Sequence, residues 1–508
     1  MLLSGASSTM EKDGDRRITK RPNMNNVMKD ELDQDMISNL PSAILIIILS
    51  KLRIDEAVRC GILSKRWLRL WKQTSHLEFD LKYTVKPLQQ VLLSRKPRVV
   101  PDLNTYDPSL YKLVYACYAK VTQLILGHWG IISSCRIRHF RKNIGLGDVT
   151  DWVVCLIDSK EVKDLSLECA PDSRETDESI AFREDVYLID FPDGIFKTLD
   201  SLELINYTMY WWQPFQECCK LKKLKLKRVC LDDETLNGIL QNCVVLENFS
   251  LLESSGFEEL VIEKSKLKVL QLQALFVDEI DISCENLEIL LLDSMICEVK
   301  NVRIYAPCLR TFRSYCYSIY ARMLSVKGGK SIVKTHDILA TLSGYLARAP
   351  SCNIFQNLST LSIDLDLNKI SEATILSYVL NLCTSLQAIE ITLPVFMPRN
   401  FVYNSNISHP MSKFWDKRKL CYCTSQKLKF VYMRGFKGNV QEVEFAKYLI
   451  TRATMLKRIT IICSDSMEVA ENLLSLPRAS ATLSINLKLN ANNPMDEFAE
   501  HQNRQLKW

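Results

Sequence analysis

The sequence predicts an α/β protein: a small N-terminal module of three helices, then an irregular solenoid of strand-containing repeats, then a cap on the end of that solenoid. Three observations predict it. Residues 35–71 form the densest apolar stretch of the chain and contain several helix start signals. A six-residue apolar phrase then recurs at steps of 20 to 25 residues, and residues 425–490 alternate strand-like and helix-like segments.

The first helix of the module opens at Leu40 and Pro41, because a proline in the first turn of a helix loses no backbone hydrogen bond. Residues 43–49 are apolar on every face, so this helix must be covered on all sides. Seven apolar residues are far fewer than the roughly twenty that span a bilayer, which excludes a membrane segment here.

Two further short helices are expected in the module. Asp55 is the expected N-cap of a helix over 56–62, and Ser64 that of a helix over 65–71. Three such helices bury too little surface to be stable alone. The module is therefore expected to need a partner, or to pack as a small cap on a larger core.

The order and spacing of residue types in this module resemble an F-box, at the positions Ile37, Ser38, Leu40, Pro41, Ile48, Leu49, Leu52, Val58, Leu63 to Trp67, Leu70 and Trp71. Ser42 departs from the pattern, since an acidic residue is more usual there. The resemblance implies docking onto the SKP-type adaptor of a cullin ubiquitin ligase, with adaptor contacts from Leu40, Pro41, Ile48, Leu52, Val58, Leu63, Trp67 and Leu70. Some of these, Trp67 and Ile48 above all, could instead hold the three helices together.

The recurring phrase has the form Leu-x-x-Leu-x-Leu and starts at Leu199, Leu221, Leu246, Leu267, Leu287 and Leu309. Related phrases start at Ile132, Val162, Leu358, Leu386, Leu428 and Leu456. This period is typical of leucine-rich repeats, in which a strand and a return segment stack on their neighbours. The return segment 232–242 reads as a helix and the return segment 277–285 as β structure, so the solenoid is expected to be irregular.

This order of parts resembles the F-box/leucine-rich-repeat family that is expanded in plants. Residues 236–247 resemble the family's repeat junction, although Asn242 and Val244 replace its usual Gly and Pro. Residues 428–461, followed by Leu-Pro-Arg-Ala-Ser at 476–480, resemble the FBD domain of one branch of the family.

The predicted domain limits follow from these patterns. They are a disordered tail at 1–32, the F-box at 33–80, a connector at 81–120, the leucine-rich-repeat solenoid at 121–415, the FBD-like cap at 425–490 and a tail at 491–508.

Composition narrows the class of protein. The formal net charge of +6 over 508 residues is mild and argues against nucleic-acid binding. The 18 cysteines are spread along the chain and form no CxxC pair, which favours reduced thiols and argues against zinc or a disulfide framework. With no signal-like or membrane-length apolar run, we expect an intracellular protein of the nucleus, the cytoplasm or both.

No catalytic constellation is visible, so we expect no enzyme activity and no cofactor. The run Gly328-Gly329-Lys330-Ser331 lacks the upstream glycine of a phosphate-binding loop. The six histidines have no nucleophile or carboxylate at motif spacing.

The target surface is expected on the solvent side of the repeat strands, where residues alternate with the buried positions. Three lysines on one strand favour an acidic partner, while three aliphatic residues on later strands leave an apolar patch. The candidate substrate-binding residues are Lys223, Lys225, Lys227, Val269, Ile289 and Leu291. Equally, the lysines could be a solvated strand and loops could cover the patch.

The sequence therefore predicts a non-catalytic substrate receptor of an SCF-type ubiquitin ligase, which binds the adaptor, through it a cullin, and a target protein of unknown identity. The alternative is a leucine-rich-repeat scaffold or small-ligand sensor without a ubiquitin role.

Overall fold

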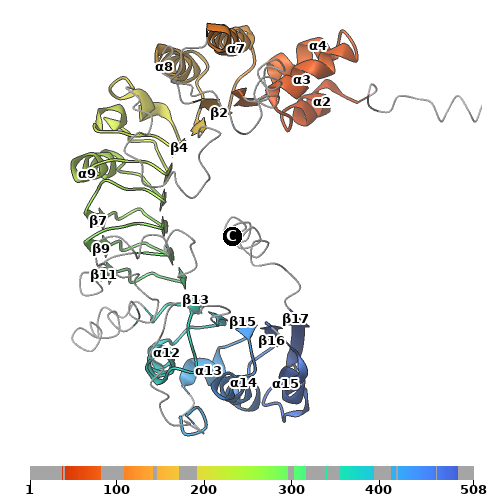
Figure 1. Ribbon diagram of the computed structural model, residues 1–508, viewed down its shortest axis with the longest axis vertical. Helices are drawn as coiled ribbons and strands as arrows, with labels where there is room; N and C mark the ends of the chain where they lie inside the picture. Colours follow the sequence, from red (N-terminus) through yellow and green to blue (C-terminus); the bar gives the residue numbers. More distant parts are fainter. Residues whose placement is uncertain are drawn as a thin grey trace, which may run out of the picture.

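The structure, a computed structural model, describes residues 37, 40–81, 108–140, 146–170, 191–295, 302–315, 339, 355–393, 414–418, 421–464 and 466–489. The chain forms a curved solenoid in which strands line the inner side of the arc and most helices lie on the outer side (Figure 1). The N-terminal helices lie at one end of the arc and the last strands at the other.

The inner side is one parallel sheet, which has 14 strands within the described residues. In spatial order these are β1 (His76–Asp80), β2 (Ser134–Phe140), β3 (Asp164–Ala170), β4 (Ser201–Ile205), β5 (Lys223–Lys227), β6 (Asn248–Leu252), β8 (Val269–Gln273), β10 (Ile289–Asp293), β12 (Thr311–Tyr315), β13 (Thr360–Asp364), β14 (Ala388–Thr392), β15 (Phe430–Phe436), β16 (Arg458–Cys463) and β17 (Ser484–Leu489). The predicted α/β solenoid is confirmed.

Each of the twelve predicted phrases forms one of these strands, and each strand begins two residues after the first residue of its phrase. Leu221, for example, precedes β5, whose Leu224 and Leu226 are buried while the lysines between and beside them face solvent. The period-two alternation predicted for the phrases is therefore present.

The helices of the N-terminal module are α2 (Ser42–Leu49), α3 (Ile54–Arg59) and α4 (Trp67–Leu70). The outer helices are α7 (Pro108–Gly127), α8 (Leu146–Val154), α9 (Asp233–Asn242), α12 (Ile370–Leu382), α13 (Tyr422–Gln426), α14 (Val440–Arg452) and α15 (Glu468–Glu471). Helix α9 confirms the helical return segment, and its N-cap Asp232 accepts a hydrogen bond from the backbone N–H of Thr235 at 2.8 Å.

One predicted helix start in the module is wrong. Helix α3 begins before Asp55, and its N-cap is Arg53, whose backbone N–H donates a hydrogen bond to Glu56. Ser64 caps the third helix as predicted, because its Oγ accepts from the Trp67 N–H at 3.4 Å and its carbonyl oxygen from the Leu68 N–H at 3.1 Å, although regular α4 geometry begins only at Trp67.

A second, three-stranded parallel sheet lies behind the middle of the first, with the order β11 (Val302–Tyr305), β9 (Glu279–Ser283), β7 (Glu259–Glu263). In this stretch the return segments are strands instead of helices. Strand β9 confirms the β structure expected within 277–285, whereas β7 and β11 were not anticipated.

A left-handed residue follows five consecutive strands of the inner sheet. Asn206, Arg228, Glu253, Ala274 and Ser294 come directly after β4, β5, β6, β8 and β10, with φ between 50° and 63°. None of them is glycine, so each repeat accepts some backbone strain to turn the chain away from the sheet.

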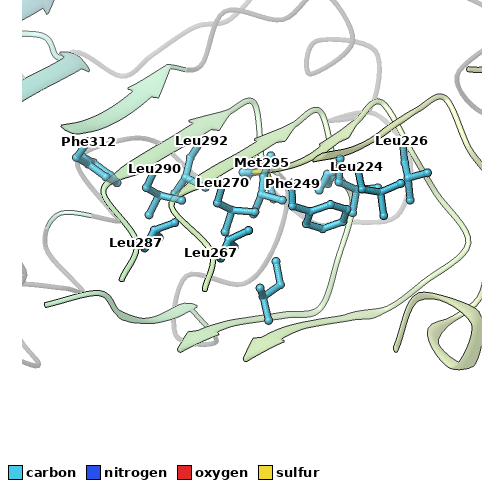
Figure 2. Packing of buried hydrophobic residues seen from close by; sticks show 14 of the residues in the cluster. Leu224, Leu226, Phe249, Leu267, Leu270, Leu287, Leu290, Leu292, Met295 and Phe312 are labelled. Carbon is cyan, nitrogen blue, oxygen red and sulfur yellow. The ribbon is translucent and has the colours of Figure 1, made fainter. Parts of the chain in front are cut away.

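The core runs between the inner sheet and the return segments as a ladder of aliphatic and aromatic side chains, with Leu224, Phe249, Leu270, Leu290 and Phe312 on successive strands (Figure 2). The same buried cluster continues from the N-terminal module to the last strand. Stacking therefore buries what no single repeat could bury.

Several predictions fall outside the described residues: the tails at 1–32 and 491–508, most of the connector at 81–120, and the run Gly328–Ser331. The described end of the connector is helical, because α7 begins at Pro108. The predicted domain limits stay predictions.

Candidate functional site

The N-terminal module carries an unusual amount of exposed apolar surface. Helix α2 fully buries only Leu45 and Leu49, while its isoleucines Ile44, Ile47 and Ile48 are exposed to solvent. The exposed side chains are Ile37 (56% exposed), Ile44 (42%), Ile47 (57%), Ile48 (40%), Ile62 (88%), Leu63 (68%) and Leu68 (53%). So many large apolar side chains on three short helices mark an interaction surface.

The predicted adaptor-binding residues divide into three groups by their burial. Pro41, Ile48 and Leu63 are exposed, and Leu40, Leu52 and Val58 are half-buried. Trp67 and Leu70 are buried in the module's own core. The role of all eight residues in adaptor binding stays a prediction. The burial of Trp67 and Leu70 accords with the alternative that they hold the three helices together. Sequence reasoning missed Ile44, Ile47, Ile62 and Leu68, whose exposure depends on how the helices pack.

The module is held in a fixed shape by Arg66. Its guanidinium donates to the Leu40 carbonyl oxygen at 2.6 Å and to Ser42 Oγ at 3.0 Å. This ties the start of α2 to the start of α4, so the exposed isoleucines and leucines keep one arrangement.

The junction between the module and the solenoid is closed by backbone hydrogen bonds and a tight glycine contact. The Lys72 carbonyl oxygen accepts hydrogen bonds from the N–H groups of both Trp129 and Gly130, at 3.2 and 3.0 Å. A Cβ atom on Gly130 would lie 2.8 Å from the Gln73 Cα, so only glycine fits this contact. Strand β1 then follows the module directly and pairs in register with β2.

The concave face of the inner sheet carries a row of polar side chains near mid-strand, interrupted by Leu291 of β10. The row includes Arg136, Ser166, Glu203, Lys225, Ser250, Gln271, Arg313, Ser362, Glu390 and Tyr432. Register places each of them beside the next at the strand spacing of about 4.8 Å, except that Leu291 lies between Gln271 and Arg313. This arrangement can bind an extended or folded polar partner along its length.

Most charges in this row are paired. Lys225 Nζ lies 2.7 Å from Glu203, and Ser166 donates to the same carboxylate at 2.6 Å. Burial alone would raise the pKa of Glu203, but these two hydrogen bonds hold it below its usual value. The pKa of Glu390 is lowered in the same way. Burial alone would raise it, but the charge of Arg434 and hydrogen bonds from Ser362 and Arg434 hold it below its usual value.

The three predicted substrate-binding lysines are not equivalent. Lys225 is paired with Glu203, and Lys227 lies 3.5 Å from Glu253. Lys223 is the exposed one of the three. The strand therefore presents less positive charge than its sequence suggests.

The predicted apolar patch is compact. Register places Val269 beside Ile289, and Leu291 beside Gln271, on neighbouring strands β8 and β10. All three aliphatic side chains are half-buried. Lys223 and Val269 both pair with Asn248 of β6, so the lysines and the patch share one surface. Their role in binding stays a prediction.

An open cavity of about 240 Å³ lies where the module meets the first strands, with Ser50, His76, Arg136, Asp164 and Glu203 in its lining. His76 Nδ1 lies 2.6 Å from Ser134 Oγ. Within the described residues no cluster of three metal-ligating side chains is present, and no helix is both long and apolar enough to cross a membrane.

Two aromatic segments, one at 212–215 and one around Trp415, pack against neighbouring helices. Pro214 and Phe215 are buried, and Trp212 packs on Gly238 of α9. Trp415 is 1% exposed, and its ring lies 4.6 Å from that of Phe445 and 5.6 Å from that of Tyr448, both on α14. Trp415 thus anchors its loop to the C-terminal region.

Comparison with known families now identifies both ends of the chain. The F-box domain matches residues 37–78, which include all three module helices and the start of β1. The FBD family matches residues 417–461, which include α13, β15, α14 and most of β16. The chain contains an F-box domain and an FBD domain. The exposed apolar surface described above is the surface of its F-box.

The middle of the chain is related to the same group of proteins. An F-box protein of Arabidopsis thaliana is 28% identical over 439 residues, which cover 84% of this chain and 83% of that protein. A putative F-box/LRR-repeat protein of the same plant is 23% identical over 478 residues (89% and 96%), and an F-box/FBD/LRR-repeat protein is 24% identical over 476 (88% and 95%). The chain is thus distantly homologous to Arabidopsis F-box/FBD/LRR-repeat proteins, and the predicted family resemblance is confirmed.

Proposed function

We propose that the protein is the substrate-recognition subunit of an SCF-type cullin ubiquitin ligase. In this role the F-box binds an SKP-type adaptor and, through it, a cullin, while the repeats bind a target protein for ubiquitination. One observation carries the proposal: the F-box leaves Ile47, Ile62 and Leu63 more than half exposed. Burying such side chains against a partner contributes about 1.5 to 3 kcal/mol each.

The hydrogen-bonded junction supports a receptor role. A receptor of this kind needs no chemistry of its own, because it raises the effective concentration of the target near the ubiquitin-loaded enzyme. That mechanism works best when adaptor and target are held on one stiff body, and the hydrogen bonds from Trp129 and Gly130 to Lys72 favour such a body. Assembly with a cullin would take place inside the cell, and the described cysteines are free in the structure, as is usual for proteins of a reducing compartment.

The adaptor interface can be tested with the variant Ile47→Asp/Leu63→Asp. Both side chains are exposed, so the folded state should lose at most about 0.5 kcal/mol per substitution. Binding of a purified SKP-type adaptor, measured by calorimetry, should weaken at least 30-fold, because a buried charge replaces a buried apolar contact. Val440→Asp is the matched control, since Val440 is 65% exposed but lies on α14 in the FBD domain.

Unchanged adaptor binding by the double variant would overturn the proposal. Loss of binding by Val440→Asp as well would point to a general folding defect instead. The folded state of each variant is checked by its urea midpoint.

For the target we propose the surface formed by Lys223, Lys225, Lys227, Val269, Ile289 and Leu291. Lys223 offers exposed positive charge beside the aliphatic patch, so an acidic partner segment with apolar side chains fits it. Affinity purification with the Ile47→Asp/Leu63→Asp variant should retain targets that the complete ligase would consume. Lys223→Glu with Ile289→Asp should then release them, and retention of the same proteins would exclude this surface.

A further inference from the structure

Three cysteines meet where helices α12 and α13 pack together. Cys383 is the C-cap of α12, Cys421 is the N-cap of α13, and Cys423 lies within α13. The sulfur atoms of Cys421 and Cys423 are 3.7 Å apart. Among the residues that the structure describes, this region holds no metal-binding cluster, so the proximity of the thiols calls for another account.

The two thiols of the close pair have different surroundings. Cys421 Sγ lies 2.7 Å from the hydroxyl oxygen of Thr424, whereas Cys423 donates to the Leu380 carbonyl oxygen at 3.0 Å. Contacts with Cys423, whose single thiol hydrogen is shared between Cys421 and the Leu380 carbonyl oxygen, and with Thr424 outweigh burial and lower the pKa of Cys421, while the pKa of Cys423 is raised. The thiolate therefore forms more readily on Cys421 than on Cys423.

Access also distinguishes the two sulfur-bearing residues. Cys421 is 8% exposed, whereas Cys423 and Cys383 are 0% and 1% exposed. Cys421 is thus the least enclosed of the three, so a small oxidant that enters this region meets it first, and Cys423 is the thiol that can react with it next.

We propose that Cys421 and Cys423 form a redox-reactive pair that a hydroperoxide oxidises to an intrachain disulfide. The Cys421 thiolate attacks the peroxide, becomes a sulfenic acid and releases hydroxide (with hydrogen peroxide as the oxidant). The Cys423 thiol then attacks the sulfenic sulfur, the S–S bond forms and water leaves. Two thiols lose two electrons to one peroxide, so the reaction is balanced.

The sulfur atoms are already close. To form the bond they must approach from 3.7 Å to about 2.05 Å. The bond removes the thiol hydrogen that Cys423 gives to Leu380, and so weakens the link between α12 and α13 at the entry to the FBD domain. The inference does not depend on the ubiquitin-ligase role.

A single peptide reports the reaction in the full-length protein. Trypsin releases residues 420–427, which contain both cysteines and no others. After treatment with hydrogen peroxide and alkylation, mass spectrometry should show this peptide two hydrogens lighter and unalkylated. The reductant dithiothreitol should restore alkylation of both cysteines.

Variants separate the two steps. Cys423→Ser should stop at a sulfenic acid on Cys421, detected as an adduct with a 1,3-dione, and Cys421→Ser should leave Cys423 unreacted. Thr424→Val keeps both thiols but removes the hydroxyl, so peroxide should oxidise the pair several-fold more slowly at pH 7. Cys383→Ser is the control and should still form the disulfide.

The wild-type protein alone can overturn the proposal. Alkylation of Cys421 should follow a titration below the usual range of a cysteine thiol. The pair is not a redox site if peroxide oxidises Cys219 or Cys308 while the 420–427 peptide stays fully alkylated.

Discussion

The indole of Trp212 lies directly on Gly238 of helix α9, where an added Cβ atom would be 2.2 Å from Trp212 Cγ. Gly238 is buried in the middle of a ten-residue helix. The contact closes the aromatic segment over the repeat, and it makes a glycine necessary at a helical position that would otherwise favour alanine.

Gly238→Ala should therefore destabilise the protein by about 1 to 2 kcal/mol, because overpacking costs more than the gain in helix propensity. In a Trp212→Ala background the same change should instead stabilise α9 by up to about 1 kcal/mol. Urea denaturation of the four proteins in this double-mutant cycle checks both signs. A destabilising effect of equal size in both backgrounds would mean that Trp212 is not the cause.

Ala274→Gly should raise stability by about 0.5 kcal/mol. The left-handed conformation of Ala274, with φ of 50°, costs an alanine about 1 to 2 kcal/mol, and the greater freedom of glycine in the unfolded chain offsets part of the gain. Ala306→Gly is the matched control, since Ala306 is also buried but has no positive φ. It should lower the urea midpoint, and a rise in both variants would contradict this account.

Glu442 organises the turn between β15 and α14 in the FBD domain. One carboxylate oxygen accepts from the backbone N–H groups of Lys437 and Gly438, at 2.8 and 3.1 Å. The other accepts from the side-chain amides of Asn439 and Asn368, at 2.9 and 3.2 Å.

Glu442→Gln should lower the free energy of unfolding by about 1 to 3 kcal/mol. The NH₂ group that replaces one carboxylate oxygen cannot accept a hydrogen bond, so the two donors that face it lose their acceptor. Hydrogen exchange at Lys437 and Gly438 should become faster along with the loss of stability. Glu471→Gln, on the exposed side of α15, is the control and should change neither. Unaltered exchange in Glu442→Gln would show that the turn does not depend on the carboxylate.

His128 should make the junction between F-box and solenoid sensitive to acid. Burial and the nearby Lys160 lower its pKa to about 4, from about 6.5 in the unfolded chain. Between these values the unfolded state binds a proton that the folded state refuses, so stability falls as pH falls through this window and is complete above it. The full effect is about 3 kcal/mol.

The test compares wild-type protein with His128→Asn by urea denaturation from pH 4 to 7. The difference in unfolding free energy, wild type minus variant, should increase towards pH 6.5 and then become constant. A difference that does not vary with pH would remove His128 as the cause.

Local sequence patterns were sufficient to predict the strands of the inner sheet, because each phrase places its own leucines in the core. They could not predict the second sheet. The segment Glu259–Glu263 becomes strand β7 only because β9, formed by residues 279–283, lies beside it. The residues of this segment suit a strand, but which segment it pairs with depends on how the repeats stack.

The candidate site was predictable to a similar degree. The F-box motif residues could be named in advance, but exposure could not, since Ile62 and Leu68 reach solvent only through the packing of the three helices. The positive charge predicted for the lysine strand did not take account of Glu203. This residue lies 22 residues before Lys225 in the sequence but directly beside it in the sheet, and it pairs with that lysine.

The junction at Lys72 fixes the first strand of the inner sheet to the F-box, so a position along the sheet corresponds to a distance from the F-box. Strand β1 leaves the F-box and every later strand adds one spacing of about 4.8 Å, so β14, ten strands further along, lies about 48 Å away along the sheet. The strand on which a partner binds thus sets its distance from the F-box. Inserting or deleting one repeat would move every partner beyond it by a single fixed increment, without changing either binding surface.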